Sequence, residues 1–279
     1  MSKIEDQGPQ VSVLMSVYSE EDSAFFHRSL ESIWTDQELK PDQIVLIKNG
    51  PLNVELEDVI KFWCLKLPSV LDVINLVENR GFARALNVGL AACKGVFIAR
   101  MDTDDISTPD RFREQSFFLN KNQHVDVVGS YVSEIDERGE TIKDIVKYPR
   151  CHDELKTFFE KRDPLAHPSV MFRQSFFQKA GLYSEKHPLF EDTYLWFMGF
   201  KSGCVFGNLD TVCLNYRRTN NFYKRRGDMS KALRLLKARV FVINRQLNYS
   251  WASDIYALCY FLMSISPAGL KRFLYNVLR

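Results

Sequence analysis

Residues 95–105 read GVFIARMDTDD, and this segment decides the fold expected for the chain. It is an apolar run, Gly95 to Met101, followed directly by the carboxylates of Asp102, Asp104 and Asp105. A short apolar run that ends in turn residues is typical of a buried strand. Three carboxylates within four positions repel one another unless a cation or hydrogen-bond donors offset their charge. A divalent metal ion is the simplest offset, because Mg²⁺ and Mn²⁺ prefer oxygen ligands together with substrate phosphates. The alternative is a solvated turn that caps the following helix.

This run is the fourth member of a regular alternation of strand and helix patterns. Strands are expected at Val11–Val17, Ile44–Ile47, Leu71–Leu76 and Gly95–Met101, and helices at Ala24–Trp34, Glu55–Leu67 and Phe82–Cys93. Such alternation predicts an α/β fold with a mostly parallel sheet flanked by helices. Sites in these sheets lie at the carboxyl ends of the strands. Here those ends are Tyr18–Glu20, Lys48–Gly50, Val77–Gly81 and Asp102–Asp105.

The second half of the chain has a mixed pattern. Helices are expected at Pro109–Lys121, Asp153–Glu160, Gln174–Ala180 and Asp192–Lys201, and strands at Val125–Ile135, Ile142–Val146, Ser169–Phe172 and Val212–Tyr216. A boundary near Arg226–Asp228 divides a domain of residues 1–226 from a C-terminal extension of residues 227–279. The extension is expected to hold a long basic helix at Ala232–Leu247 and a terminal helix pair within Trp251–Arg279.

Composition excludes several classes of protein. The chain has 279 residues, and its 37 basic and 35 acidic residues give a net charge of +2, which argues against a protein built as a whole to bind nucleic acid. Six cysteines are scattered without zinc spacing, which favours a reducing compartment. The opening MSKIEDQGPQ has no signal-like run, and the longest apolar stretch, near Ile255–Ile265, is about half of the ~20 residues that a membrane span needs. We therefore expect a cytoplasmic protein that does not span a bilayer.

Basic residues are concentrated near the C-terminus. From Tyr216 onward the only acidic residues are Asp228 and Asp254. The clusters Arg217-Arg218 and Lys224-Arg225-Arg226 are candidates for binding a diphosphate, because arginine forks match phosphate oxygens in bidentate geometry. A solvated basic face is the alternative, above all for the second cluster.

Two further groups have a structural and a functional interpretation. Glu191-Asp192 begins an expected helix, where acidic residues favour the first turn. A carboxylate at such a position that faces a cleft can also take a proton from an acceptor hydroxyl. His167 stands in a proline-containing loop after Asp163-Pro164, and both a structural and an acceptor-binding role are open for it.

In their order along the chain, these features resemble glycosyltransferase family 2, over roughly Val11 to Arg218. VLMSVY (13–18) resembles the family's opening strand, NRGFARALNVGL (79–90) its N-x-G-x-x-x-A-L-N-x-G-L helix, DTDD (102–105) its D-x-D-D segment, and Glu191-Asp192 its late acidic pair. Members have the GT-A fold, a nucleotide-binding sheet followed by an acceptor-binding half. The resemblance implies that fold here for residues 1–226.

The resemblance also implies roles for individual residues. Asp104 is the expected chief ligand of a Mn²⁺ or Mg²⁺ ion, with Asp102, which also touches the ribose, and Asp105 beside it. Asp192, with Glu191 next to it, is the expected catalytic base. The expected donor-binding residues are Tyr18 and Glu20 at the nucleoside, Asn49 at the base, Arg80 and Arg84 beside the nucleotide, and Arg217 and Arg218 at the diphosphate or a lipid phosphate. His167 is expected at the acceptor.

Two positions depart from the family pattern. The second strand ends in Lys48-Asn49-Gly50-Pro51-Leu52 rather than in the common acidic residues, although the Asn49 amide can still hydrogen-bond a base. Where many relatives place a histidine after Tyr216-Arg217, this chain has Thr219-Asn220-Asn221. The Lys-x-Gly-Pro-Leu form and HPSVMF (167–172) resemble a bacterial subgroup that builds O-antigens and exopolysaccharides.

This subgroup adds one sugar, often galactose or glucose, to an undecaprenyl-diphosphate-linked saccharide. The resemblance therefore implies an inverting, metal-dependent transfer of a hexose from a UDP-sugar to such a lipid-linked acceptor. The amphipathic C-terminal helices are expected either to contact the cytoplasmic face of the inner membrane or to pack on the protein's own core or on a partner subunit.

Two other functions remain as alternatives. A sugar nucleotidyltransferase shares the nucleotide-binding sheet but usually has a Gly-rich loop after its first strand, and Val17–Glu21 contains no glycine. The other is a non-catalytic, carbohydrate-binding assembly subunit.

Overall fold

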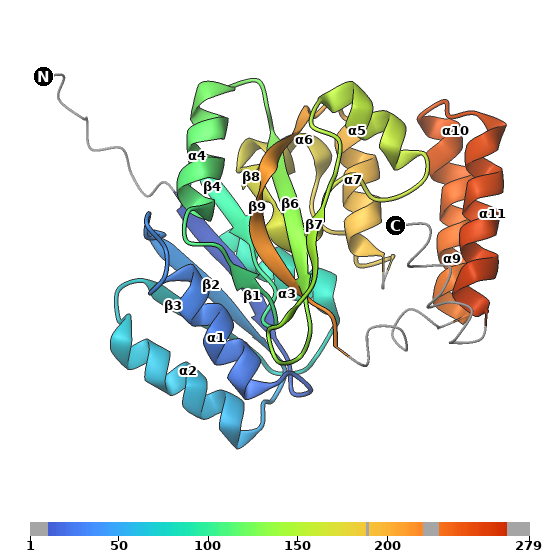
Figure 1. Cartoon of the computed structure of the whole chain (residues 1–279). Coiled ribbons are helices and arrows are strands. Elements are labelled where there is room, and N and C mark those ends of the chain that lie inside the picture. Colours follow the sequence, from blue (N-terminus) through green and yellow to red (C-terminus); the bar gives the residue numbers. More distant parts are fainter. Residues whose placement is uncertain (1–10, 188–189, 220–228, 267–279) are drawn as a thin grey trace, which may run out of the picture.

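The computed structural model describes residues 11–187, 190–219 and 229–266. Its first half confirms the predicted alternation (Figure 1). The strands are β1 (Val11–Val17), β2 (Gln43–Asn49), β3 (Leu71–Leu76) and β4 (Phe97–Arg100), and the helices between them are α1 (Ser23–Ile33), α2 (Val54–Lys66) and α3 (Phe82–Ala92). The four strands are parallel in the order β3-β2-β1-β4. Their carboxyl ends therefore share one edge of the sheet.

The second half continues the same sheet with mixed strand directions. The further strands are β5 (Ile106–Ser107), β6 (Val127–Ile135), β7 (Thr141–Val146), β8 (Met171–Arg173) and β9 (Phe206–Arg217). β8 joins β4 and β6 by antiparallel pairing, and β9 runs parallel to β6. The described residues thus form one nine-stranded sheet, in the order β3-β2-β1-β4-β8-β6-β9-β5 with β7 on β6.

Two strand predictions for this half were wrong in their extent. The strand expected at Val212–Tyr216 begins six residues earlier, at Phe206, because Gly207 and Asn208 pair with β6 despite their preference for turns. The strand expected at Ser169–Phe172 begins two residues later, at Met171. The residues before it form a 3₁₀ turn, η1 (His167–Ser169), whose second residue is Pro168, which has no N–H to give to a ladder.

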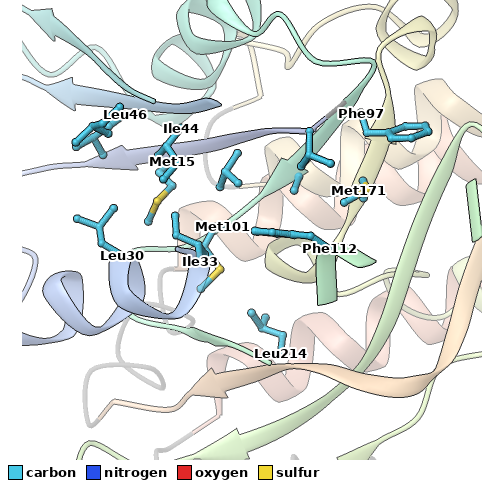
Figure 2. Close-up of a cluster of buried hydrophobic side chains, with 14 of the residues drawn as sticks. Met15, Leu30, Ile33, Ile44, Leu46, Phe97, Met101, Phe112, Met171 and Leu214 are labelled. Atoms are coloured by element: carbon cyan, nitrogen blue, oxygen red, sulfur yellow. The ribbon is translucent and has the colours of Figure 1, made fainter. Parts of the chain in front are cut away.

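Helices cover both faces of the sheet. α1, α2 and α4 (Arg111–Lys121) pack on one face, and α3, α5 (His152–Phe159), α6 (Ser175–Ala180) and α7 (Glu191–Lys201) pack on the other. Each face of the sheet therefore has its own hydrophobic core, and alternate residues of β1 point into the two. Val13 and Met15 lie in the first core, on the side of α1, and Leu14 lies in the second, on the side of α3. Figure 2 shows the first core, in which Met15 and Leu30 lie near Met101 and Phe112.

A glycine in α3 allows this helix to pack closely on the sheet. A Cβ on Gly89 would collide with the side chain of Leu14 on β1 and would lie 3.1 Å from Ile47 on β2. The helix can approach the sheet this closely only without a side chain at that position. The glycine in the sequence A-L-N-V-G-L is therefore a packing requirement of the fold.

The described part of the C-terminal extension is a helical hairpin. α9 (Met229–Ala238) continues through a π-helical turn, η2 (Arg239–Ile243), and α10 (Asn244–Gln246), and α11 (Trp251–Ile265) returns beside it (Figure 1). This confirms the long helix expected at Ala232–Leu247. The predicted boundary at Arg226–Asp228, the cluster Lys224-Arg225-Arg226 and the last predicted helix lie outside the described residues.

The hairpin is attached to the main sheet's helices by a few specific contacts. The Tyr249 hydroxyl donates to the Lys156 carbonyl (2.7 Å), and the Ser253 hydroxyl donates to Glu160 (2.9 Å). Ile243 is fully buried in the second core. Among the helices that the structure describes, none combines the length and apolar character needed to cross a membrane.

Candidate functional site

The three carboxylates after β4 come together as the sequence predicts. One oxygen from each of Asp102, Asp104 and Asp105 lies within 4.8 Å of the others. Asp105 is fully buried, and burial together with repulsion by Asp104 and Asp102 raises its pKa well above the ordinary value. Its Oδ1 accepts a hydrogen bond from the Arg217 backbone N–H (2.7 Å), whereas its buried Oδ2 has no partner. A divalent cation fits this set, because it supplies the charge and the ligation that the oxygens lack.

The loop that carries these carboxylates is fixed by Arg217, the last residue of β9. Its Nε donates to the Asp104 carbonyl (2.7 Å) and its Nη1 to the Asp136 carbonyl (2.8 Å). Its guanidinium group also lies 4.2 Å from the ring centre of Phe25. Arg217 therefore ties the acidic segment to the turn after β6 and to helix α1.

Arg218 is engaged within the protein as well. Its Nη1 lies 2.7 Å from Glu134 Oε2, and the two side chains are 11% and 1% exposed. These contacts of Arg217 and Arg218 differ from the diphosphate contact that the sequence predicts. Their role at a diphosphate stays a prediction.

Arg100, the last residue of β4, is a site residue that the sequence interpretation missed. Its side chain is 3% exposed and forms an ion pair with Asp102 Oδ1. Burial alone would lower the pKa of Arg100, but the Asp102 carboxylate raises it, so the group stays charged. Its Nε and Nη1 are buried without hydrogen-bond partners, and the residue lines a cavity. A cation with unmet donors favours an oxygen-rich or anionic ligand. The one available signal was a charged residue at the end of an otherwise apolar strand.

That cavity measures about 780 Å³ and contains the predicted base. Asp192 lies in the first turn of α7 and lines the cavity together with Asp102 and Arg100. Its Oδ1 accepts from the Thr193 backbone N–H (2.8 Å). Glu191, also in the first turn, is half-buried. The structure thus brings Asp102 of the early acidic segment and Asp192 to one cavity, although 90 residues separate them in the sequence.

His167 lines the same cavity and is deeply buried. Its Nε2 lies 2.7 Å from the Tyr183 hydroxyl, and its ring centre lies 5.9 Å from that of Trp196. Burial and the nearby charge of Arg100 lower the pKa of His167 well below its usual range, so the imidazole is neutral at physiological pH. It can therefore offer a hydrogen bond to a ligand in the cavity but no positive charge.

The loop that carries Tyr183 is held by the asparagine of the α3 motif. The Asn87 side chain donates to the Tyr183 carbonyl (2.9 Å) and accepts from the Tyr183 N–H (3.0 Å). The asparagine of A-L-N-V-G-L therefore positions the segment that leads to α7 and Asp192.

The remaining predicted donor residues lie at the carboxyl ends of β1 to β3. Asn49 ends β2, is 6% exposed, and has a buried Oδ1 without a hydrogen-bond partner. Gly50 approaches Asn79 of the β3–α3 loop so closely that a Cβ would lie 2.8 Å from its backbone nitrogen. The Asn53 amide donates to the Ser19 carbonyl (3.3 Å), which joins the loops after β1 and β2. The three strand ends therefore meet, as the parallel sheet predicts.

The charged and aromatic groups of this rim are more accessible. Tyr18 is half-buried and Glu20 is exposed. Arg80 is exposed and forms an ion pair with Glu78, and Arg84 Nη1 lies 3.7 Å from Glu185 Oε2. Their predicted contacts with the nucleotide stay predictions.

Comparison with solved structures identifies the fold. The structure of S. aureus TarS 1-349 matches 92% of this chain and 81% of its own length with a TM-score of 0.59, at 17% sequence identity. The architecture is therefore that of the GT-A glycosyltransferases.

The sequence comparisons give the family. The model of glycosyl transferase family 2 matches residues 12–181, and the chain belongs to this family. It is 32% identical over 234 residues to the UDP-Gal:alpha-D-GlcNAc-diphosphoundecaprenol beta-1,3-galactosyltransferase of Escherichia coli, covering 84% of this chain and 83% of the relative. It is 31% identical over 269 residues to the amylovoran biosynthesis glycosyltransferase AmsE of Erwinia amylovora, covering 95% and 97%. The resemblance to this family is confirmed, as is its link with bacterial polysaccharide synthesis among the relatives.

Proposed function

We propose that the protein transfers a hexose, with galactose favoured over glucose, from a UDP-sugar to a saccharide linked to undecaprenyl diphosphate, with inversion at the anomeric carbon. The observation that carries this proposal is the single cavity that Asp192 shares with Asp102 and Arg100. The donor is supported by TarS 1-349, which has been crystallised with UDP and with UDP-GlcNAc. The acceptor and the galactose are supported by the substrates named for the Escherichia coli relative. The reaction belongs to O-antigen or exopolysaccharide synthesis in the cytoplasm, at the inner membrane.

The metal site of this reaction is Asp104 with Asp102 and Asp105. A bound Mn²⁺ or Mg²⁺ ion would offset the charge of the departing nucleoside diphosphate. Asp104 is the chief ligand in this proposal, in keeping with the family's D-x-D-D segment, and the carboxylates of Asp102 and Asp105 lie beside its own. Arg217 holds the Asp104 backbone in place.

Asp192 acts as the general base. Its carboxylate takes the proton of the acceptor hydroxyl, whose oxygen forms the new bond to the anomeric carbon as the bond from that carbon to the diphosphate oxygen breaks. The electron pair of the broken bond leaves with UDP. The unmet N–H donors of Arg100 stabilise the negative charge that develops beside them.

Replacing the base separates chemistry from donor binding. Asp192→Asn is expected to lower transfer by roughly 10³-fold, because the amide cannot take the proton, while UDP affinity changes less than about twofold. Transfer is measured as UDP release and acceptor extension with Mn²⁺, a UDP-sugar and a saccharide-diphosphate-lipid analogue. Asp210→Asn is a matched control, because Asp210 is 52% exposed and forms an ion pair with Arg150.

Two results would reject parts of this proposal. Near-normal transfer by Asp192→Asn removes Asp192 from the role of base. Wild-type protein that binds UDP but extends no acceptor from any UDP-sugar indicates the non-catalytic assembly subunit instead.

A further inference from the structure

The cavity that contains Asp192 continues well beyond the reacting groups. Arg100, Asp102 and Asp192 line one part of it, and residues 160–163 together with side chains of α9 and α11 line another part, here called the outer end. Apolar side chains line this outer end, among them Leu235 and Leu236 of α9 and Ile255 and Met263 of α11. Cavities of about 300–1,000 Å³ hold ligands of drug size, so 780 Å³ leaves room for more than a single sugar.

The edge of the outer end carries uncompensated positive charge. Lys161 and Arg162 both line the cavity, and within the described residues neither side chain forms an ion pair with a carboxylate. Their contacts are with aromatic rings: Lys161 Nζ lies 5.9 Å from the ring centre of Tyr256, and the Arg162 guanidinium carbon lies 5.3 Å from that of Phe158. Two unpaired cations beside an apolar wall favour a ligand with an anionic head and an apolar chain.

The carboxylates beside them are already engaged. Glu160 accepts the Ser253 hydroxyl, and Asp163 accepts both the Thr193 hydroxyl (2.9 Å) and Arg239 Nη2 (3.2 Å). Within the described residues, neither carboxylate forms an ion pair with Lys161 or Arg162. The charge of this edge is available to a phosphate group.

The outer surface of the same hairpin is apolar. Trp251 and Phe241 are 73% and 72% exposed, and Ile255, Leu258 and Leu262 are 50%, 47% and 52% exposed. Asp254, the acidic residue of α11, is paired with Arg245 at 2.6 Å. Exposed tryptophan and aliphatic side chains on a helix with basic neighbours suit the interface of an anionic membrane. Ile255 is both exposed and part of the cavity wall, so the apolar surface continues into the cavity.

We infer that the outer end of the cavity binds the lipid diphosphate of the acceptor. Lys161 and Arg162 bind the diphosphate, the isoprenoid chain lies along Ile255, Tyr256 and Met263 toward the membrane, and the saccharide reaches Asp192. This inference rests on the proposed function and deepens it, because it assigns to the acceptor a site formed by the hairpin.

Binding of a soluble analogue tests the site without turnover. The full-length protein is titrated calorimetrically with farnesyl diphosphate, with inorganic pyrophosphate and with farnesol, in a chelating buffer that keeps the metal site empty. Wild-type protein is expected to bind farnesyl diphosphate more tightly than either fragment. The double variant Lys161→Ala/Arg162→Ala weakens that binding by about tenfold or more, because charge-assisted contacts to phosphate are lost. Ile255→Asp weakens farnesyl diphosphate but not inorganic pyrophosphate.

The controls lie on α2, at the opposite side of the molecule from the hairpin (Figure 1). Lys66 is a matched cation, since it also lies over an aromatic ring, 4.3 Å from that of Trp63. Leu65 is a matched apolar residue, 78% exposed. Lys66→Ala and Leu65→Asp are expected to leave farnesyl diphosphate binding unchanged.

Three outcomes overturn the inference. They are wild-type protein that fails to bind farnesyl diphosphate, undiminished binding by Lys161→Ala/Arg162→Ala, and a dimer in light scattering that Ile255→Asp dissociates without a change in farnesyl diphosphate affinity. The third result makes a second copy the occupant of the hairpin. A parallel titration with UDP and Mn²⁺ keeps this test separate from the proposed function, because a failure to bind UDP rejects the donor chemistry and leaves the lipid site as measured.

Discussion

The parallel half of the sheet and the helical hairpin differ in how completely their side chains are buried. In β1, six of seven residues are buried, and α1 to α3 close both faces of the strands. In α11, the buried residues are Ser253 and Ser264 alone among fifteen, while large apolar side chains point outward. The first region is fixed by its own packing, and the second leaves apolar surface for another partner. Under the proposed function, the donor site lies on the sheet, the rigid side of this comparison, and the acceptor site lies against the hairpin, the adaptable side.

The largest effect is expected on the rigid side of this comparison. Asp104→Asn should lower turnover by about 10³-fold, because the neutral amide weakens a site whose purpose is to offset charge at the diphosphate. The melting temperature should hardly change, since Asp104 is only half-buried. The measurement is Mn²⁺-dependent UDP release, with Asp58→Asn on the exposed side of α2 as the control. Activity close to that of the control would exclude Asp104 as the chief metal ligand.

A second, smaller effect is expected where Arg217 ties the acidic loop to its neighbours. Arg217→Lys retains the charge but loses the fork that reaches the carbonyls of Asp104 and Asp136, which should cost about 2 kcal/mol of unfolding free energy. Mn²⁺ affinity should fall with it. Arg150→Lys, at an exposed ion pair with Asp210, should cost less than about 1 kcal/mol. Urea unfolding and Mn²⁺ titration measure both, and equal losses in the two variants would show that Arg217 does not order the loop.

Local sequence predicted the parallel half of the sheet because each of its elements follows one simple rule. β1 to β4 are apolar runs of strand length, and the parallel alternation dictates that their carboxyl ends meet. The motif residues Asn87 and Gly89 were recognised from the sequence pattern, but their contacts are with distant segments, because Asn87 holds the Tyr183 backbone and Gly89 admits Leu14. Only the strands and their shared edge required no knowledge of distant contacts.

The features that escaped prediction depend on pairing between distant segments. In the sequence, Arg100 is one residue of an otherwise apolar strand. Its place in the site depends on its burial beside Asp102, which only the complete fold produces. The first half of β9 contains Gly207 and Asn208, and only its register with β6 makes it a strand. The inner face of the hairpin was equally hidden, because helical periodicity does not reveal which face of α11 meets residues 160–163.

A third prediction concerns how the unfolding free energy depends on pH through His167, which lines the cavity. The pKa of buried His167 is depressed in the folded state, whereas the unfolded chain titrates near 6.5, so the unfolded state binds more protons as the pH falls. The stabilisation is present above pH ~6.5 and is lost as the pH falls toward the folded-state pKa. Wild-type protein should therefore lose about 1 kcal/mol more than His167→Gln between pH ~7.5 and ~5.5. Urea unfolding at both pH values measures this, with the exposed His124→Gln as the control. Parallel pH profiles for wild type and His167→Gln would mean that His167 does not control this loss.

The smallest effect on stability, and the sharpest test of the adaptable side, is expected at Trp251. Because its side chain is 73% exposed, Trp251→Ala should change the unfolding free energy by no more than about 0.5 kcal/mol. Binding of the variant to phosphatidylglycerol vesicles, measured by co-sedimentation, should nevertheless fall severalfold. An interfacial tryptophan strengthens membrane binding through the apolar surface that it inserts. Leu65→Ala on α2 removes an apolar side chain of 78% exposure and should affect neither quantity. If Trp251→Ala instead destabilises the fold by several kcal/mol, the outer face of the hairpin packs on the protein itself, and the contrast between a rigid and an adaptable half disappears.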